Sequence, residues 1–165
     1  MNRVDGRLTA DLDPFDHGPQ DECGVIGIYA PGEDVSKLVY FGMYALQHRG
    51  QESAGMAVSD GRRTMVFKDM GLVSQVFDEA TLNSLAGHLA IGHTRYSTAG
   101  GSFLRNIQPM FADLDQGGIA IAHNGNLTNA HALKAELVDK DRRHINTESD
   151  TEVLINILAH ELSNA

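Results

Sequence analysis

Hydrophobic positions follow two spacings along this chain, and each spacing occupies blocks of sequence. Apolar residues three or four positions apart predict helices over residues 33–47, 78–85 and 129–138 and from residue 149 onward. Short apolar or alternating runs predict strands over residues 23–30, 53–59, 64–68, 88–94 and 118–123. Because helices and strands come in blocks, we expect an α+β fold with antiparallel sheets covered by helices, not a doubly wound parallel sheet.

Local signals mark the ends of these elements. The helix over 33–47 starts with two acidic residues, which suit the positive end of the helix dipole, and is followed by His-Arg-Gly. Asp-Gly-Arg-Arg at 60–63 predicts a hairpin. Ser149 and Glu152 have the spacing of a capping box at the start of the last helix. The buried stripe predicted for that helix is Val153, Leu154, Ile157, Leu158 and Leu162.

Residues 1–22 follow neither spacing. They hold six acidic residues against two arginines, and prolines and glycines interrupt any helical period. Such a segment buries too little apolar surface to offset the entropy lost on ordering, so we expect it to be a disordered leader. Whether this leader is a tail without a role or a propeptide depends on the residue that follows it.

Composition narrows the class of protein. The 165 residues suit one domain, and 42% hydrophobic with 21% charged residues is ordinary for a globular protein. A net charge of −9 argues against nucleic-acid binding through a basic surface. A single cysteine excludes a disulfide framework and fits a reducing compartment. With no long apolar run and no signal-peptide pattern, we expect a cytoplasmic protein that has no membrane partner.

The single cysteine, Cys23, stands where the leader meets the first predicted strand. If the bond after Glu22 is broken, Cys23 carries a free α-amine beside its own thiol. An α-amine titrates near ~7.7–8.0 and a thiol near ~8.5, so the amine can take the thiol proton. This places a nucleophile and its base on one residue. The alternative is that Cys23 is a small buried hydrophobic residue without a chemical role.

Three further positions carry chemistry that would suit an amino-acid substrate. Arg95 ends a predicted strand and offers a planar fork for a carboxylate, or forms a structural ion pair. Asn124 and Gly125 offer two N–H donors for a developing oxyanion, or make only an Asn-Gly turn. Asp150 would bind an ammonium group, or only stabilise the start of its helix. Together they would hold an α-amino acid whose side chain Cys23 attacks.

Five stretches of the sequence resemble class II glutamine amidotransferases, the N-terminal nucleophile amidotransferases, in motif and in order. They are Cys-Gly-Val-Ile-Gly at 23–27 and the stretches at 45–55, 92–98, 123–127 and 148–152. Within this family, Leu-Gln-His-Arg-Gly-Gln-Glu-Ser at 46–53 most resembles the amidophosphoribosyltransferase subfamily. The resemblance implies a four-layer αββα sandwich and the hydrolysis of L-glutamine to glutamate and ammonia. In that subfamily the ammonia passes to phosphoribosyl pyrophosphate, giving 5-phosphoribosylamine in the first step of purine synthesis.

The resemblance also assigns roles residue by residue. It implies that Cys23 is the nucleophile, with its freed amine as the base, and that Asn124 and the Gly125 N–H form the oxyanion hole. It implies a leader at 1–22, removed as a propeptide, and a glutaminase domain over 23–165. The implied glutamine-binding residues are Arg95 and Thr98 for the carboxylate, Asp150 for the ammonium group and Arg49 in a loop that closes near the cysteine.

The phosphoribosyltransferase half of the family pattern is absent from this sequence. The resemblance therefore implies no cofactor in this chain, because Mg²⁺, and the iron–sulfur cluster of some members, would belong to that C-terminal domain. The implied partners are L-glutamine and, in the full enzyme, the phosphoribosyltransferase domain or further copies of the protein.

Other hypotheses stay open on the residues alone. The chain could belong to another class II amidotransferase, or be an inactive precursor or subunit, since an amide nitrogen in an uncleaved chain cannot act as a base. Cys23 could instead pair with His48, His93 or His123 as in papain-like hydrolases. A metal site is disfavoured because no pair of the eight histidines has a recognised ligand spacing.

Overall fold

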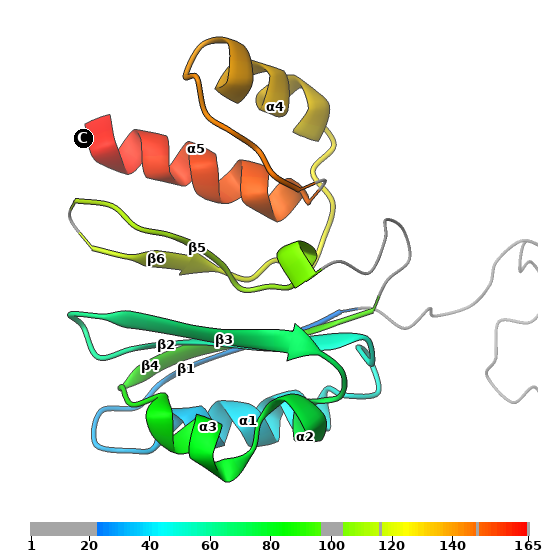
Figure 1. Cartoon of the computed structure of the whole chain (residues 1–165), viewed down its shortest axis with the longest axis vertical. Coiled ribbons are helices and arrows are strands. Elements are labelled where there is room, and N and C mark those ends of the chain that lie inside the picture. Colours follow the sequence, from blue (N-terminus) through cyan, green and yellow to red (C-terminus); the bar gives the residue numbers. More distant parts are fainter. Residues whose placement is uncertain (1–22, 97–103, 116, 148, 165) are drawn as a thin grey trace, which may run out of the picture.

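A four-stranded antiparallel sheet forms one half of the molecule. The computed structural model describes residues 23–96, 104–115, 117–147 and 149–164, so the leader at 1–22 lies outside the described residues. The strands of this sheet are β1 (Gly24–Tyr29), β2 (Ser53–Ser59), β3 (Thr64–Met70) and β4 (Leu89–Arg95). Their order is β1-β4-β2-β3. Helices α1 (Val35–Ala45), α2 (Val73–Val76) and α3 (Glu79–Ser84) cover its outer face (Figure 1).

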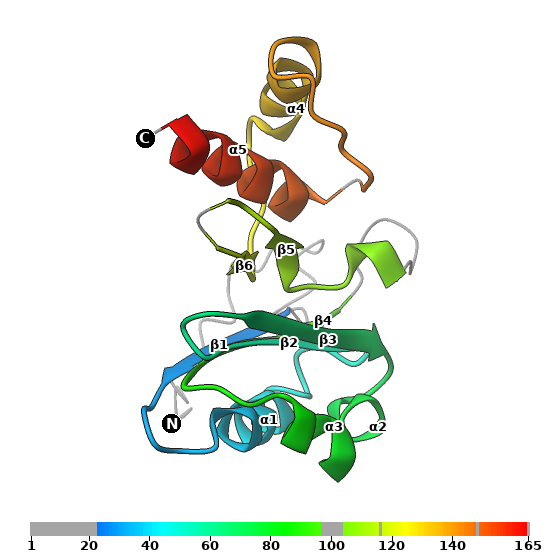
Figure 2. The ribbon, with the colours of Figure 1, turned by 60° about the vertical axis from the view of Figure 1, so that its left-hand side comes forward.

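The other half is built on a two-stranded antiparallel sheet of β5 (Met110–Ala112) and β6 (Ile119–Ile121), preceded by the short 3₁₀ helix η1 (Leu104–Asn106). Helix α5 (Asp150–Asn164) packs on this sheet, and α4 (Ala130–Asp139) packs on α5. Figures 1 and 2 show the resulting order of layers, helix, sheet, sheet, helix. This arrangement confirms the predicted α+β class with αββα layers.

Helix α1 packs closely on the large sheet because a glycine of β4, Gly92, lies opposite it. A Cβ at Gly92 of β4 would lie 2.6 Å from Met43 Sδ and from Val39 Cγ1 of α1. Val39 and Met43 are fully buried and belong to the main hydrophobic core, which fills the space between the large sheet and its three helices. This packing fixes β4, the strand that ends at Arg95.

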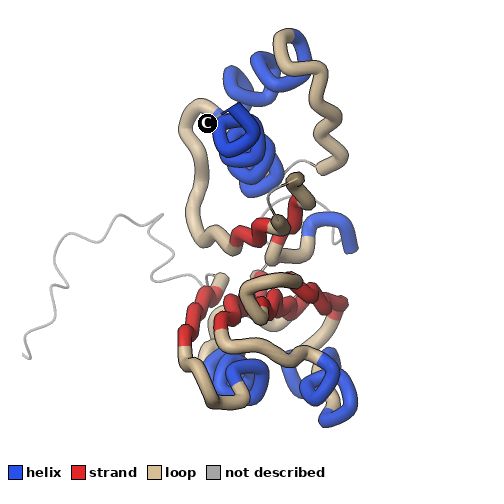
Figure 3. Tube along the Cα trace, turned by 90° about the vertical axis from the view of Figure 1, so that its left-hand side faces the viewer, coloured by secondary structure: helices blue, strands red, loops and turns tan. Residues whose placement is uncertain are grey.

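The two sheets meet through the segment that enters β5. A Cβ at Gly55 of β2 would lie 2.0 Å from the carbonyl oxygen of Gln108, so this contact requires glycine. Lys68 Nζ of β3 donates to the carbonyl oxygens of Ile107 at 2.6 Å and Pro109 at 3.0 Å. Burial lowers the pKa of Lys68. Figure 3 shows the two strand layers facing each other across this junction.

The predicted elements are all present, with ends shifted by at most two residues. The sequence patterns missed α2, η1 and β5, which are only four, three and three residues long. Such short elements contain too few positions for a spacing to show. Among the described residues, no helix is both long and apolar enough to cross a membrane.

The start and the buried face of α5 differ from the prediction. The Glu152 carboxylate accepts from the backbone N–H of Asn146 at 2.8 Å and of Thr147 at 2.6 Å, so it does not close a capping box on Ser149. Burial raises the pKa of Glu152, but these hydrogen bonds outweigh burial and hold the pKa below its usual value. Leu158 is exposed, whereas Ile155 and Ala159 are buried. Helix α5 lies between the small sheet and α4 (Figure 1), so its buried positions are not confined to the single predicted stripe.

We predict that Gly55→Ala destabilises the fold by about 1–3 kcal/mol, because the added methyl group overlaps the Gln108 carbonyl. Gly27→Ala in β1 is the matched control, since its Cβ would make an ordinary contact of 3.7 Å with Ile91 Cγ2. The measurement is the free energy of unfolding by urea denaturation. Equal stability of the two variants would contradict the close contact between the sheets.

Candidate active site

Cys23 lies directly before β1, at the edge of the large sheet. Gly24 pairs with Thr94 in the antiparallel register, so Cys23 lies beside Arg95 at the end of β4. The half-buried Cys23 thiol is 3.7 Å from the carbonyl oxygen of Tyr96, to which it donates. A Cβ at Gly24 would lie 2.7 Å from Thr94 Oγ1, so the chain after the cysteine is packed tightly against β4.

The loop after β6 brings Asn124 and Gly125 to the cysteine. Asn124 Nδ2 donates to the Cys23 carbonyl oxygen at 2.6 Å, although the two residues are 101 positions apart in sequence. An amide group has two N–H donors, so this contact leaves a second hydrogen on Asn124 Nδ2. A Cβ at Gly125 would lie 2.9 Å from His123 Nε2, so a larger residue would require that imidazole ring to shift. The Asn124 hydrogen bond therefore brings one predicted oxyanion donor, and the loop that carries the other, next to the residue of the predicted nucleophile.

Asp150 anchors the far end of the same loop. It is the first residue of α5, and its Oδ2 accepts from the backbone N–H of Leu127 at 2.9 Å. Its Oδ1 lies 3.6 Å from His123 Nδ1. The structure thus connects Asp150 to the segment that carries Asn124 and Gly125.

Arg95 lies at the end of β4, and the turn that contains Arg49 packs against it. Arg95 is half-buried, and its Nη1 donates to the carbonyl oxygen of Asn106 at 3.1 Å. Arg49 lies in the turn after α1, where a Cβ at Gly50 would lie 2.7 Å from the Arg95 backbone nitrogen. Thr98 lies outside the described residues. The functional roles of all these residues stay predictions.

Within the described residues, no hydrogen bond joins the Cys23 thiol to a histidine, as a cysteine–histidine pair would require. The thiol donates to a carbonyl oxygen, while His48 Nδ1 contacts the Ala45 carbonyl oxygen at 3.0 Å and His123 Nδ1 faces Asp150. Burial, and then the positive charge of Arg95, lower the pKa of His93 to about 4. His93 is therefore neutral at pH 7.

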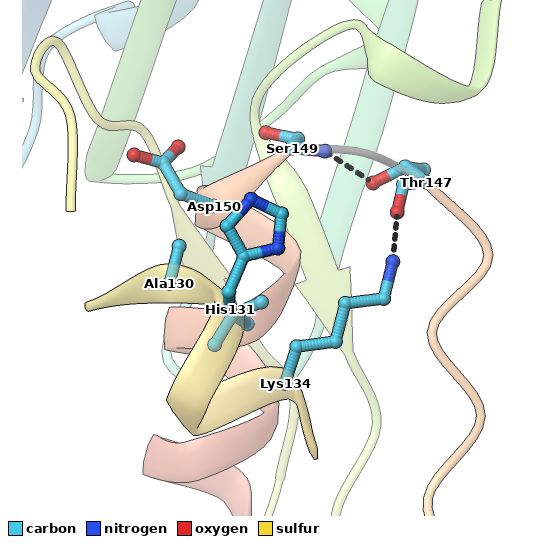
Figure 4. Close-up of a pocket in the computed structure, with 7 residues that line it drawn as sticks. Ala130, His131, Lys134, Thr147, Ser149 and Asp150 are labelled. Atoms are coloured by element: carbon cyan, nitrogen blue, oxygen red, sulfur yellow. Dashed lines mark hydrogen bonds between the residues drawn. The ribbon is translucent and has the colours of Figure 1, made fainter. Parts of the chain in front are cut away.

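A pocket of about 480 Å³ lies between α4 and the start of α5, and Asp150 reaches it (Figure 4). Lys134 Nζ donates to the Thr147 carbonyl oxygen at 3.2 Å along its wall. Lys134 and Thr147 belong to none of the sequence motifs, so neither was predicted as a site residue. No group of three side chains suited to hold a metal ion occurs within the described segments.

The glutamine amidotransferase domain family matches residues 78–162. The chain belongs to this family. It is 54% identical over 149 residues to an amidophosphoribosyltransferase of Mycobacterium tuberculosis, a match that covers 87% of this chain and 28% of the relative. An amidophosphoribosyltransferase of Synechococcus elongatus is 54% identical over 153 residues, with 89% of this chain and 31% of the relative covered.

Two solved structures share the fold of this amidotransferase domain. The glutamine phosphoribosylpyrophosphate amidotransferase from B. subtilis, complexed with ADP and GMP, is 40% identical with a TM-score of 0.72; the match covers 81% of this chain and 28% of that one. A structure described as the allosteric regulatory enzyme of purine biosynthesis is 42% identical with a TM-score of 0.75, covering 81% and 29%. The chain therefore spans less than a third of the length of these relatives.

We predict that His93 makes the stability of the domain depend on pH. Its pKa is about 4 in the folded chain, against an ordinary 6.5. Below pH 6.5 the unfolded chain therefore binds a proton that the folded chain does not, and the free energy of unfolding falls until pH 4. A shift of this size corresponds to about 3 kcal/mol.

The measurement compares urea unfolding of the wild type and of His93→Asn at pH 7 and pH 4. The wild type should lose about 3 kcal/mol more than the variant over this range. An NMR titration that shows the His93 ring taking up its proton near pH 6.5 would contradict the prediction.

Proposed function

We propose that this chain is the glutaminase part of an amidophosphoribosyltransferase, hydrolysing L-glutamine to glutamate and ammonia through a cysteinyl thioester. The observation that carries the proposal is the hydrogen bond from Asn124 Nδ2 to the Cys23 carbonyl oxygen. This bond joins the residue with the single thiol to the loop with two oxyanion donors. Family membership and the amidophosphoribosyltransferase names of the relatives support the same conclusion.

The chemistry begins when the peptide bond between Glu22 and Cys23 is cleaved. The α-amine of Cys23 takes the thiol proton, and Sγ attacks the amide carbon of the glutamine side chain. Negative charge develops on the amide oxygen, where Asn124 Nδ2 and the Gly125 N–H donate hydrogen bonds. The tetrahedral intermediate collapses, and ammonia leaves with the proton held by the α-ammonium group. Water then hydrolyses the γ-glutamyl thioester, which releases glutamate and regenerates the thiol.

The two charged groups of glutamine, which share its α-carbon, would be held by residues from different halves of the molecule. Arg95 binds the α-carboxylate, with Thr98 beside it, and Asp150 binds the α-ammonium group. Arg49 belongs to a loop that closes over the bound substrate. The positions of Arg95 beside Cys23 in the register and of Asp150 at the end of the Asn124 loop support these roles.

The product ammonia would be used by a domain outside this chain. In the full enzyme a phosphoribosyltransferase domain transfers it to phosphoribosyl pyrophosphate, giving 5-phosphoribosylamine in purine synthesis. Mg²⁺, and an iron–sulfur cluster where one is present, belong to that domain. Residues 1–22 act as a propeptide and residues 23–165 as the glutaminase domain. We place the enzyme in the cytoplasm, which suits a free catalytic thiol, and expect it to form homo-oligomers.

The direct test measures ammonia release from glutamine by the chain with and without residues 1–22, with intact mass showing which form is present. The cleaved chain should release ammonia, whereas the uncleaved chain should not, because its Cys23 nitrogen is an amide. Cys23→Ala and Cys23→Ser should abolish the activity of the cleaved chain without unfolding it. Ammonia release by the uncleaved chain, or by either variant, would refute the mechanism.

A second prediction concerns substrate binding. Arg95→Ala and Asp150→Asn should raise the KM for glutamine about 10- to 100-fold with little change in kcat, because each removes a charged contact made in both the ground and transition states. Asp150→Asn keeps an oxygen that accepts from Leu127. The controls are Arg62→Ala in an exposed hairpin and Glu136→Ala on α4. A collapse of kcat with unchanged KM would show that these roles are wrong.

A further inference from the structure

We propose that Gln108 is a positioning residue. It holds the proposed oxyanion donors, Asn124 and Gly125, in place relative to the Cys23 thiol. The inference rests on the proposed glutaminase function and adds a residue that no motif of the sequence singled out. Gln108 is buried, at 8% exposed, in the segment between η1 and β5. Its side chain reaches away from the large sheet to the backbone of the loop that follows β6.

The backbone of Gln108 is held firmly by the large sheet. Gly55 contacts its carbonyl group so closely that no side chain fits at position 55. Lys68 Nζ binds the carbonyl oxygens of Ile107 and Pro109, one on each side of Gln108. The Gln108 side chain therefore starts from a backbone whose place is set by β2 and β3.

The side chain of Gln108 binds the start of residues 123–127, the segment after β6 that carries both proposed oxyanion donors and is called here the oxyanion loop. Its Oε1 accepts from the backbone N–H of His123 at 2.6 Å. The next two residues along the chain are Asn124 and Gly125, which carry the proposed oxyanion donors. A glutamine side chain thus connects the sheet that carries the nucleophile to the donors.

Within the part of the chain that the structure describes, three hydrogen bonds join residues 123–127 to other segments. One of these three lies upstream of both donors. The downstream bond runs from the Leu127 N–H to Asp150, and the middle one runs from the Asn124 side chain to the Cys23 carbonyl oxygen. The upstream bond is the one to Gln108. Loss of its acceptor leaves the His123 N–H, in a part-buried place, without that partner, so the loop would shift to find another.

A small shift of this loop would affect the transition state more than substrate binding. Oxyanion donors act at about 2.7–3.1 Å from the developing charge, and the loss of one costs about 10²–10³ in kcat. The carboxylate-binding candidate Arg95 is held separately, by the backbone oxygen of Asn106, which a change in the Gln108 side chain leaves in place. Gln108 should therefore influence kcat and not KM.

The test compares Gln108→Met, which removes the acceptor at similar length, with Gln108→Glu, which keeps an acceptor oxygen in either protonation state. The matched control is Gln75→Met, because Gln75 Oε1 also accepts a backbone N–H, that of Leu72 at 3.0 Å, at an exposed site on α2. Each cleaved chain is assayed for glutamine hydrolysis and for alkylation of its single thiol by iodoacetamide. Alkylation needs the thiolate but forms no oxyanion.

We expect Gln108→Met to lose about 10- to 100-fold in kcat, with KM within threefold and the alkylation rate within twofold of the wild type. Gln108→Glu should recover most of kcat, and Gln75→Met should match the wild type. An unchanged kcat in Gln108→Met would overturn the proposal. So would equal losses of hydrolysis and alkylation, since these would indicate only general structural support.

If Gln108→Met does not fold, Gln108→Asn tests the positioning role in its place. Its amide oxygen is withdrawn by one methylene, so kcat should fall while alkylation is kept, and a wild-type kcat would overturn the proposal. A cleaved wild-type chain that alkylates but releases no ammonia would refute the glutaminase function itself. A normal wild type with a normal Gln108→Met would refute the positioning role alone.

Discussion

The contact between residues 106–109 and the large sheet is the constraint on which the candidate site depends. It places the half-buried ammonium group of Lys68 against two backbone carbonyl oxygens and brings a peptide group onto a bare glycine of β2. A charged group that is partly removed from water needs hydrogen-bond partners, and the two carbonyl oxygens supply them. These directional contacts therefore fix where residues 106–109 lie on the large sheet.

The site is divided between the two halves that this contact joins. The large sheet supplies Cys23 and Arg95 from adjacent strand ends. The smaller half supplies Asn124 and Gly125 from a loop and Asp150 from the start of a helix. Neither half contains a complete set of groups for amide hydrolysis. The chemistry proposed for this family member therefore exists only at the junction between the two sheets.

Sequence patterns predicted the long elements and the site residues for different reasons. Spacing suffices for α1 and for the four long strands, and the chemical types of Cys23 and Asp150 suggest roles without any structure. Gln108 could not be found in this way, because its importance comes from where its backbone is held and not from its neighbours in sequence. The capping box predicted between Ser149 and Glu152 was wrong for a similar reason. The Glu152 carboxylate accepts hydrogen bonds from backbone N–H groups of the preceding loop, which sequence spacing does not reveal.

The pairing of Gly24 with Thr94 places Cys23 at the very start of β1, and the proposed removal of residues 1–22 has to respect that position. A strand advances about 3.3 Å per residue, and neighbouring side chains point to opposite faces. A cut one bond too early would leave the terminal amine about one residue away from the sulfur, and a cut one bond too late would remove the sulfur altogether. The proposed mechanism therefore requires cleavage at the single bond before Cys23, because only that cut leaves the amine and the thiol on one residue.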